Sequence, residues 1–315
     1  MSKLEDLKLE LKSLGSKYAK IKTLPASERK AFGEELNSKK SALLAEIAAL
    51  ESAAESENLE PVDLSAPFAA NAEPPHRPQG TKHPLTTELD RVAEIYRLMG
   101  FNIIESRQLD DEFHMFESLN FPEGHPARDG YDTFRTSEGF IPPAQTSTMQ
   151  YRALTAFRND LETKGQIAVA IPGRTFRNED VDATHEHTFY QCEGVFVSKD
   201  ANLGQLLSVL KTFFETYYGQ SLNIKTQPGF FPFTEPSLEF QIEKPASLGG
   251  KGDGWPEMCG CGMIHPNVLK TAGIDPAVYK GFAWGGGIDR LIMLKYGIND
   301  IRYLESGKLS FLKEF

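Results

Sequence analysis

Three blocks of this sequence carry side chains that could bind a charged ligand. The first, HPLT at residues 83–86, leads into a helical pattern. The second, PGRTFRNE at 172–179, continues through a polar loop to FYQCEG at 189–194. The third, GFAWGGGIDRL at 281–291, places three glycines before an aspartate and an arginine. Each block alone is compatible with ordinary surface structure, so only their combination indicates a site.

The second block has the composition of a site for an amino acid and a nucleotide. Alternate residues of a strand share a face, so Arg177 is expected beside Glu179. By the same rule Phe189, Gln191 and Glu193 share a face of the following strand. A guanidinium group offers a planar fork to phosphate, Gln and Glu can hold an ammonium group, and an aromatic ring can stack on a base. Ion pairs on a solvated hairpin are the alternative for any one of these residues.

The third block places consecutive glycines between a predicted strand and a predicted helix. Glycine lets a ligand approach the backbone closely, and Arg290 at the helix start is expected to point back toward the sheet. A dinucleotide-binding turn is the competing interpretation. The sequence after residue 291 is too short for the βαβ unit that such a turn requires.

Residues 1–57 predict an antiparallel helical hairpin. Apolar residues recur every three or four positions from Leu4 to Ile21 and from Phe32 to Ala54, with a break at Leu24-Pro25. Two such stripes are typical of an antiparallel coiled coil. Residues 1–40 hold ten Lys or Arg and six Asp or Glu, although the whole chain carries a net charge of −10. A dimerisation or solubility arm and an RNA-contacting arm are both compatible with this composition.

The remaining sequence predicts a linker followed by an α+β domain. Residues 58–82 contain five prolines without periodicity, which is typical of a linker. From 83 to 315, helices are predicted after a cap at Thr86 or Thr87, at 203–218 and at 289–296; strands are predicted at 101–104, 166–171 and 188–197 and around Ile224, Phe240 and Phe282. The irregular spacing of the helices favours a mostly antiparallel sheet flanked by helices over a doubly wound parallel sheet.

The overall composition is that of an ordinary globular protein, with 40% hydrophobic and 25% charged residues. No apolar run is long enough to span a membrane, and the charged N-terminus lacks the apolar core of a secretion signal. The three cysteines do not form a disulfide framework, which favours the reducing cytoplasm. The spacing of Cys259, Cys261 and His265 does not match a zinc site, and His185-x-His187 favours a nucleotide-contacting loop over a metal site.

The three blocks, in this order, resemble motifs 1, 2 and 3 of the class II aminoacyl-tRNA synthetases. Further segments narrow the resemblance to the alpha chains of the phenylalanine-specific enzymes: residues 120–129 (NFPEGHPARD), 131–134 (YDTF), 145–150 (QTSTMQ), 182–186 (DATHE), 231–236 (FPFTEP), 262–266 (GMIHP) and 296–302 (YGINDIR). The resemblance covers nearly all of 83–315. It implies a class II catalytic domain there, a tRNA-contacting coiled-coil arm at 1–57 and a linker at 58–82.

The implied activity is ATP-dependent activation of L-phenylalanine to phenylalanyl-adenylate, followed by transfer to tRNA(Phe). Arg177 and Arg290 are the implied catalytic residues. The implied ATP contacts are Arg177, Glu179, His185, Phe189 and Arg290. The implied phenylalanine contacts are Tyr131, Gln145, Ser147, Gln191, Glu193, Phe231, Phe233 and Ala283. Mg²⁺ would accompany ATP, with Glu235 as its ligand.

The sequence departs from the family pattern at several positions. Residues 141–147 read IPPAQTS where relatives commonly read LLRTHTS, so Gln145 replaces a histidine. Trp284 replaces phenylalanine, which we expect to be tolerated, with crowding of the adenine or of the pocket as the alternative. Gly286 and Asp289 replace a larger residue and a glutamate, which we expect to be tolerated.

The resemblance also bears on partners and on alternative functions. Single-chain relatives of organelles append an anticodon-binding domain after motif 3, whereas residues 301–315 are too short for one. We therefore expect a beta subunit and an (αβ)₂ heterotetramer, with the helix after His83 near the dimer axis. A class II ligase of the phosphoseryl-tRNA type would need basic residues where Phe231, Phe233 and Ala283 stand. A non-catalytic paralogue acting as a binding module is disfavoured because the nucleotide-binding residues are all present.

Overall fold

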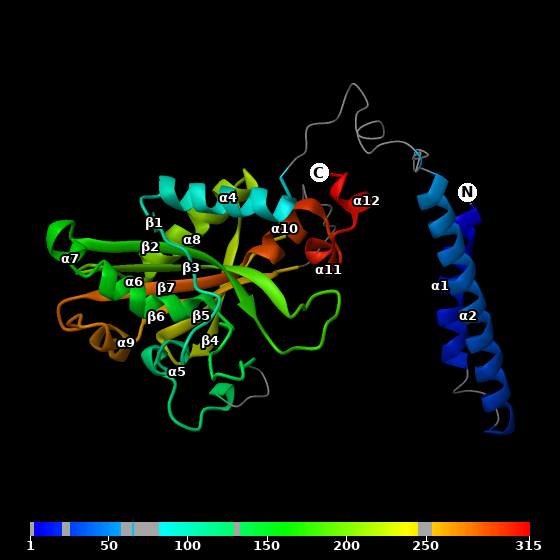
Figure 1. The fold of residues 1–315 in the computed structure, drawn as a ribbon, viewed down its shortest axis with the longest axis horizontal. Helices are drawn as coiled ribbons and strands as arrows, with labels where there is room; N and C mark the ends of the chain where they lie inside the picture. Colours follow the sequence, from blue (N-terminus) through cyan, green and yellow to red (C-terminus); the bar gives the residue numbers. More distant parts are fainter. Residues whose placement is uncertain (1–2, 21–25, 58–64, 66–81, 129–132, 245–253) are drawn as a thin grey trace. The chain divides into compact units, whose positions relative to one another are not determined.

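The computed structural model describes residues 3–20, 26–57, 65, 82–128, 133–244 and 254–315. Two compact units divide the chain, residues 1–79 and 80–315, and both are drawn in Figure 1. The predicted break at Leu24-Pro25 lies outside the described residues, as does the predicted linker apart from Ser65 and Lys82.

The first unit contains helices α1 (Lys3–Lys20) and α2 (Ala26–Glu57). The second unit contains a seven-stranded sheet. Its strands are β1 (Asn102–Ile103), β2 (Gln166–Phe176), β3 (Thr188–Ser198), β4 (Ile224–Phe231), β5 (Thr234–Ile242), β6 (Glu257–Ile264) and β7 (Lys280–Gly287). The longer helices are α4 (Pro84–Leu98), α6 (Gln150–Ala156), α8 (Leu203–Tyr218), α9 (Pro266–Thr271) and α10 (Ile288–Tyr296). Short helical turns are α5 (Glu112–Met115), α7 (Asp160–Thr163), α11 (Arg302–Glu305), α12 (Leu309–Leu312), η2 (Glu117–Leu119), η3 (Pro126–Arg128) and η4 (Thr146–Met149).

The two helices of the first unit pair in antiparallel fashion, which confirms the predicted hairpin. Tyr18 Oη donates a hydrogen bond of 2.6 Å to Asn37 Oδ1. Closer to the start of α1, Lys3 Nζ lies 3.0 Å from a carboxylate oxygen of Glu46, further along α2. The end of α1 therefore contacts the first part of α2, and the start of α1 contacts a later part of α2, as in an antiparallel pair. Leu36, an apolar residue of the predicted stripe in α2, is buried.

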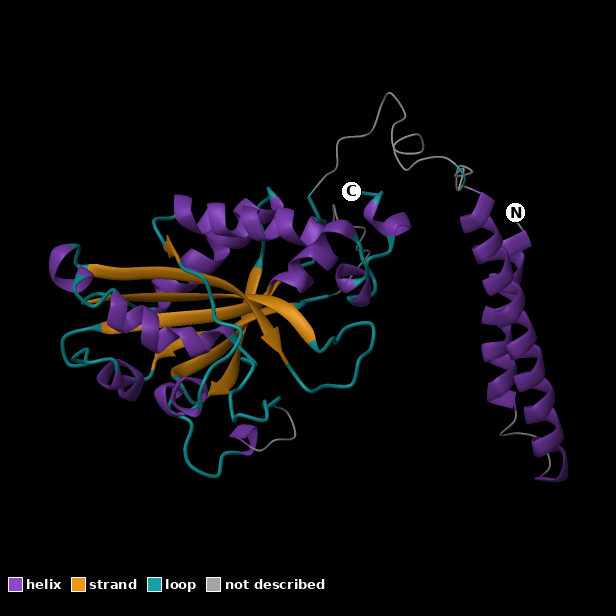
Figure 2. Ribbon diagram, in the orientation of Figure 1, coloured by secondary structure: helices purple, strands orange, loops and turns teal. Residues whose placement is uncertain are grey.

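The sheet of the second unit has the strand order β1-β2-β3-β7-β6-β5-β4 (Figure 2). Only β1 and β2 pair in parallel; every other neighbouring pair is antiparallel. This confirms the predicted α+β fold with a mostly antiparallel sheet. Strands β3 and β7 lie in the middle of the order, so the second and third sequence blocks come together although almost ninety residues separate them.

Helices cover both faces of this sheet (Figure 1). Residues of α4, α8 and α10, including Leu210 and Ile292, form one apolar core with one face. Residues of α6, α7 and α9, including Leu154 and Leu269, form a second core with the other face. None of the helices within the described ranges has the length and apolar character needed to cross a bilayer.

Local sequence signals account for where the long helices begin and end. Asn202 and Gln205 form a reciprocal capping box at the start of α8, and Gly219 ends it with φ +69°, a left-handed conformation that glycine adopts without strain. The predicted cap of α4 at Thr86 or Thr87 is wrong. His83 caps the helix instead, because Pro84 fits the first helical position, where its missing N–H is not needed.

Strand β6 was not predicted, because its sequence EMCGCGMI is rich in glycine, a weak strand former. The tertiary structure explains those glycines. A Cβ at Gly260 would lie 2.7 Å from the Phe231 ring, and one at Gly262 would lie 2.3 Å from the Pro236 carbonyl oxygen. Close contacts with Phe231 of β4 and Pro236 of β5 therefore require the glycines that weaken the local strand signal.

A buried ion pair joins α4 to α10. Glu88 is 1% exposed, and Oε1 accepts hydrogen bonds of 2.5 Å from Lys295 Nζ and from Tyr296 Oη. Burial by itself would raise the pKa of Glu88, but the hydrogen bonds from Lys295 and Tyr296 outweigh it and lower the pKa below its usual value. Glu88 is therefore ionised at neutral pH and depends on its cationic partner.

We expect the substitution Lys295→Met to destabilise the chain by about 3 kcal/mol at pH 7, because it leaves the buried carboxylate without a cation. A lower urea midpoint of unfolding would show this loss. The penalty should shrink as the pH falls through 4.5, the ordinary pKa of a glutamate, since protonated Glu88 no longer needs the pair. The double variant Glu88→Gln, Lys295→Met should be more stable than Lys295→Met alone, and a double variant that is less stable would contradict the account.

Candidate functional site

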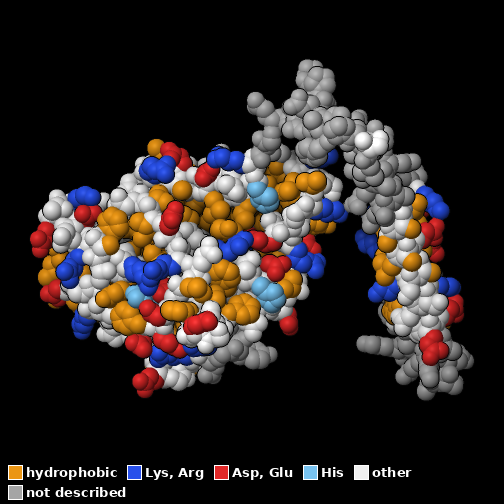
Figure 3. All heavy atoms as spheres, in the orientation of Figure 1, with side chains coloured by type: hydrophobic (Ala, Val, Ile, Leu, Met, Phe, Trp, Pro, Cys, Tyr) orange, Lys and Arg blue, Asp and Glu red, His pale blue; other side chains and the backbone are white. Residues whose placement is uncertain are grey.

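A cavity of about 650 Å³ lies where β3, β6 and β7 meet the start of α10 and the loop between β2 and β3. It collects residues from distant parts of the chain. The predicted site residues that line it are Gln145, Ser147, Arg177, Glu179, His185, Phe189, Gln191, Glu193, Phe231, Phe233, Ala283 and Arg290. The visible face of the second unit shows Lys and Arg interspersed with Asp and Glu (Figure 3), so a phosphate site there must be local.

Arg177 is oriented by three neighbours. Its Nε donates to the carbonyl oxygen of Ala144 at 3.0 Å, its Cζ lies 5.0 Å from the centre of the Phe189 ring, and Nη1 lies 3.6 Å from Glu179 Oε1. The prediction that Arg177 and Glu179 lie on a strand is wrong, because β2 ends at Phe176 and both residues belong to the loop. The guanidinium group is nevertheless fixed beside an aromatic ring that could stack on a base.

Arg290 reaches the same cavity from the first turn of α10, as expected. Its Nη1 donates to the carbonyl oxygen of Glu257 at 2.9 Å, at the start of β6. The neighbouring Asp289 is buried, and one of its carboxylate oxygens accepts a hydrogen bond of 2.6 Å from the Tyr190 backbone N–H on β3. Burial raises the pKa of Asp289 to about 7. Asp289 thus ties the helix that carries Arg290 to the strand that carries Gln191.

The glycines at 285–287 belong to β7, whereas the sequence predicted them between the strand and the following helix. A Cβ at Gly285 would lie 2.6 Å from Glu193 Oε2, and one at Gly286 would lie 2.7 Å from the Met258 carbonyl oxygen. Glycine is required here so that neighbouring strands and the Glu193 side chain can come close.

Glu193 is a buried carboxyl group in the cavity wall, 1% exposed. Ser147 Oγ donates to its Oε2 at 2.8 Å and Gln150 Nε2 donates to its Oε1 at 2.6 Å. Burial raises the pKa of Glu193 to about 7 despite these hydrogen bonds. Such a group is only partly ionised at neutral pH, and a ligand ammonium placed beside it would stabilise the carboxylate form.

Amide groups from two segments meet next to Glu193. The backbone N–H of Thr146 donates to Gln191 Oε1 at 3.3 Å, and Gln145, at the start of η4, also lines the cavity. Pro142 and Pro143 lie just before this segment. The Pro143 carbonyl oxygen accepts a hydrogen bond of 2.8 Å from the Phe176 backbone N–H at the end of β2, which holds the Gln145 segment against the sheet.

The other end of the cavity is apolar. The rings of Phe231 and Phe233 are stacked with their centres 5.9 Å apart, and Ala283 on β7 is buried. Glu193 pairs with Gly285, two residues from Ala283 along β7. Two residues of a strand span about 7 Å, so the carboxyl group and the apolar end lie within the reach of one amino acid.

Trp284 is among the residues that line the cavity, but its ring packs into the apolar core on the other face of the sheet and does not crowd the pocket. Successive residues of β7 face opposite sides of the sheet, so Ala283 and Trp284 belong to different apolar cores. The indole Nε1 donates to Tyr96 Oη of α4 at 2.9 Å. Gly194 leaves room for the ring, because a Cβ there would lie 2.0 Å from it.

Two predicted site residues are not among those that line the cavity. Tyr131 lies outside the described residues. Glu235 has a side chain that is 76% exposed and lies 3.6 Å from His265 Nε2. Within the ranges that the structure describes, only Asp110, Asp111 and His114 bring three potential metal-binding atoms within 4.8 Å of one another, and they are not part of the cavity wall.

Sequence reasoning assigned no role to two residues that shape the cavity. Gln150 is fully buried and holds Glu193, and nothing in its local sequence marks it for this role. Glu257 lines the cavity, and its carbonyl oxygen accepts the hydrogen bond from Arg290 Nη1. Glu257 is the first residue of β6, and because β6 was not predicted, the position of Glu257 beside Arg290 could not be predicted either.

Residues 67–315 match the family model described as "tRNA synthetases class II core domain (F)". Among curated proteins, the phenylalanine–tRNA ligase alpha subunit of Shouchella clausii is 42% identical over 76% of this chain and 71% of its own length. The proteins of the same name from Afipia carboxidovorans and Vibrio cholerae are 39% and 37% identical, covering 96% and 100% of this chain and 86% and 90% of their own lengths.

Proposed function

The chain belongs to the class II tRNA synthetases and, within them, to the phenylalanine–tRNA ligase alpha subunits, and we propose on this basis that it activates L-phenylalanine with ATP and transfers it to tRNA(Phe). One observation carries the proposal for this chain: a single cavity joins two arginines, a buried carboxyl group and an apolar end. Phosphate, ammonium and phenyl ring each find a complementary group there.

In the first step, a carboxylate oxygen of phenylalanine attacks the α-phosphorus of ATP. The bond from that phosphorus to the bridging oxygen breaks, and pyrophosphate leaves with the electron pair. Arg177 binds the α-phosphate and stabilises the negative charge that develops on it. Arg290, in the first turn of α10, contributes to the same charge stabilisation. No protein nucleophile is required, so the chain contributes mainly positioning and charge.

The nucleotide occupies the end of the cavity that the two arginines define. The adenine ring lies between Phe189 and Arg290, and Glu179 and His185 contact the nucleotide. Support comes from the positions of these side chains on the cavity wall, and from the 5.0 Å separation of the Arg177 guanidinium and the Phe189 ring, which brings the phosphate-binding and base-stacking groups together.

Phenylalanine occupies the other end. Its ammonium group is held by Glu193, Gln191 and Ser147, with Gln145 nearby, and its ring contacts Phe231 and Phe233. Tyr131 is assigned to the same pocket by resemblance alone. Ala283 closes the far end, where a tyrosine hydroxyl would lose its water without a partner, at a cost of about 1–3 kcal/mol.

Mg²⁺ fits the cavity through its donor chemistry, since this ion is commonly bound by one or two carboxylates together with substrate phosphates. Glu257 is a carboxylate of the cavity wall beside Arg290 and is the residue we assign to it. The exposed Glu235, suggested by the resemblance, lies outside the cavity lining and is the alternative. The ion would neutralise phosphate charge when bound.

In the second step, the 2′-hydroxyl of the terminal tRNA ribose attacks the carbonyl carbon of the adenylate and AMP leaves. Residues 1–57 are proposed to contact the tRNA as a coiled-coil arm, joined through residues 58–82 to the catalytic domain at 83–315. The excess of Lys and Arg in residues 1–40 supports this assignment.

Deletion of residues 1–57 should weaken tRNA charging about tenfold or more while sparing phenylalanine-dependent ATP–pyrophosphate exchange, because only the first depends on phosphate contacts made by the arm. Raising the salt concentration should narrow the difference in charging between the full and truncated chains. Equal losses in both assays would assign the arm to folding.

Substituting Ala283→Gly should admit para-chlorophenylalanine to the exchange reaction, since it removes the methyl group at the end of the pocket. The kcat/KM for phenylalanine should fall by about fivefold, the value of one buried methyl group. Ala170→Gly removes a comparable buried methyl from the opposite sheet face and should not admit the analogue. Unchanged selectivity in Ala283→Gly would show that the pocket lies elsewhere.

The relatives are named alpha subunits, and we propose that this chain likewise works with a beta subunit in an (αβ)₂ heterotetramer in the cytoplasm. Gel filtration of the alpha chain alone tests this: an active monomer would contradict the assembly. The helix α4, which follows His83, is assigned to the neighbourhood of the dimer axis by resemblance.

The decisive experiment is ATP–pyrophosphate exchange with the beta subunit present and each of the twenty amino acids in turn. We expect phenylalanine to be the one amino acid of the twenty that supports exchange. Preference for phosphoserine would favour the phosphoseryl type, which the apolar pocket end disfavours. Exchange with none would favour a non-catalytic paralogue.

A further inference from the structure

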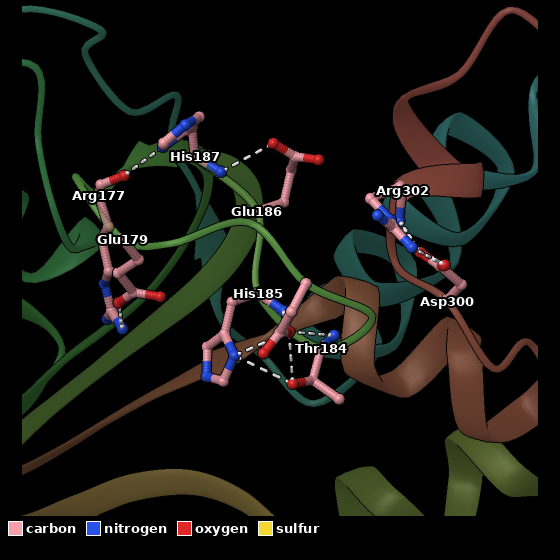
Figure 4. Close-up of polar contacts among 9 residues, drawn as sticks. Arg177, Glu179, Thr184, His185, Glu186, His187, Asp300 and Arg302 are labelled. Atoms are coloured by element: carbon pink, nitrogen blue, oxygen red, sulfur yellow. Dashed lines mark hydrogen bonds and ion pairs between the residues drawn. The ribbon is translucent and has the colours of Figure 1, made fainter. Parts of the chain in front are cut away.

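The loop between β2 and β3, residues 177–187, supplies part of the cavity wall without belonging to a strand or helix. Thr184, His185 and Glu186 of this loop line the cavity. Figure 4 shows the loop curving past these side chains toward Asp300 and Arg302. An irregular segment loses conformational entropy when it is held in one shape, so specific contacts must hold it.

Asp182 supplies most of these contacts through a single oxygen. Its Oδ1 accepts hydrogen bonds from the Thr184 backbone N–H at 2.6 Å, the Thr184 hydroxyl at 2.9 Å, and the His185 backbone N–H at 2.8 Å. Nδ1 of the His185 ring lies 3.0 Å from the same oxygen and also 3.0 Å from the Thr184 hydroxyl oxygen, and it donates to Asp182 when it carries the ring proton. The hydrogen bonds from Thr184 and His185 hold the pKa of Asp182 well below its usual range.

Two backbone hydrogen bonds also hold the loop, one between its two ends and one to the rest of the domain. At its base, the Arg177 backbone N–H donates to the His187 carbonyl oxygen at 2.9 Å. At its flank, the Ala183 carbonyl oxygen accepts from the Ile301 backbone N–H at 2.9 Å. The Asp182 side chain is 59% exposed, so its contacts organise the loop and contribute little to the hydrophobic core.

We propose that Asp182 is a positioning residue for ATP, which holds Thr184 and His185 against the cavity before the nucleotide binds. Asp182 is not among the residues that line the cavity. With Nδ1 of His185 bonded to Asp182, Nε2 is the ring nitrogen left for a ligand. The proposal rests on the proposed function, because it takes the ligand of this wall to be ATP. Preorganisation of this kind increases affinity by reducing the ordering cost on binding.

The test compares variants of the alpha chain assembled with its beta subunit. Asp182→Ala removes every hydrogen bond that the side chain makes to the turn and keeps the bond of 3.0 Å from the residue 182 backbone N–H to the His185 carbonyl oxygen. Asp182→Asn keeps, in addition, a side-chain oxygen that can accept from the two backbone N–H groups. Asp180→Ala is the matched control. Asp180 is exposed, carries the same charge and lies in the same loop, but makes no hydrogen bond or ion pair with the residues that the structure describes. Exchange kinetics give kcat and the KM for ATP and for phenylalanine, and thermal melting gives Tm.

Asp182→Ala should raise the KM for ATP about tenfold, the effect of losing hydrogen bonds to a charged group, with the KM for phenylalanine and Tm unchanged. Asp182→Asn should restore most of the affinity, and Asp180→Ala should match the wild type. The proposal is overturned if Asp182→Ala and Asp180→Ala share one KM for ATP, or if the KM for phenylalanine and Tm shift together with it. Absence of phenylalanine-dependent exchange in the wild type would instead overturn the proposed function.

Discussion

Arg177→Lys should lower the kcat of phenylalanine-dependent ATP–pyrophosphate exchange by about 10²–10³-fold and leave the KM for phenylalanine almost unchanged. The structure holds the Arg177 guanidinium by its Nε, which donates to Ala144, and by the contact of Nη1 with Glu179 at 3.6 Å. Nη2 then remains for a phosphate. A lysine ammonium keeps the charge but loses the planar fork. The expected loss is that of one preorganised donor to a developing charge.

The matched control for this substitution is Arg107→Lys, since Arg107 is exposed and is not among the cavity residues. Its kinetics should equal those of the wild type. A rise in the KM for phenylalanine with an unaltered kcat in Arg177→Lys would place the guanidinium on the amino-acid side of the cavity and contradict its assignment to the α-phosphate.

The KM for phenylalanine should rise about tenfold for each pH unit below 7. Burial raises the pKa of Glu193 to about 7, and only its ionised form attracts the ammonium group of the substrate. Below that pH the carboxyl group is increasingly protonated, so binding costs the free energy of removing its proton, about 1.4 kcal/mol per pH unit. The amino group of free phenylalanine stays protonated throughout this range. Exchange kinetics between pH 5 and 8 measure the effect.

Glu193→Gln is the control for the pH dependence. It should raise the KM for phenylalanine at pH 8 and remove the steep rise at low pH. Burial also raises the pKa of Asp289 to about 7. Asp289 precedes Arg290 in the chain and bonds to the backbone of β3, so its titration should change the KM for ATP more than the KM for phenylalanine. A pH profile that persists in Glu193→Gln and disappears in Asp289→Asn would assign the titration to Asp289.

Several elements could be predicted because their signals are local. The helix at 203–218 and the strand starting at Thr188 follow from apolar periodicity and β-forming residues. The failures have different causes. Strand β6 has weak strand propensity, and its glycines are explained only by the approach of Phe231 from β4 and Pro236 from β5. The cap of α4 depended on His83, a residue type seldom considered for that role.

The candidate site was predictable as a set of residues, since the resemblance supplied their types and order. Its internal geometry was not. Gln150 could not be connected with Glu193, forty-three residues away, without knowing that η4 and α6 pack against β3. Similarly, the sequence left crowding of the pocket by Trp284 open as an alternative, and the alternation of β7 turns the ring into the opposite core, against Tyr96.

By itself, the amino-acid order determined the helical hairpin, the mostly antiparallel sheet and the kinds of groups available to bind a nucleotide and an amino acid, because these follow from periodicity and residue chemistry over short stretches. Only the tertiary structure decided that Arg177 and Arg290 share one cavity, and that Glu193 is buried enough to titrate near neutral pH. Both outcomes depend on the pairing of β3 with β7, a long-range register that brings together residues which no local pattern connects.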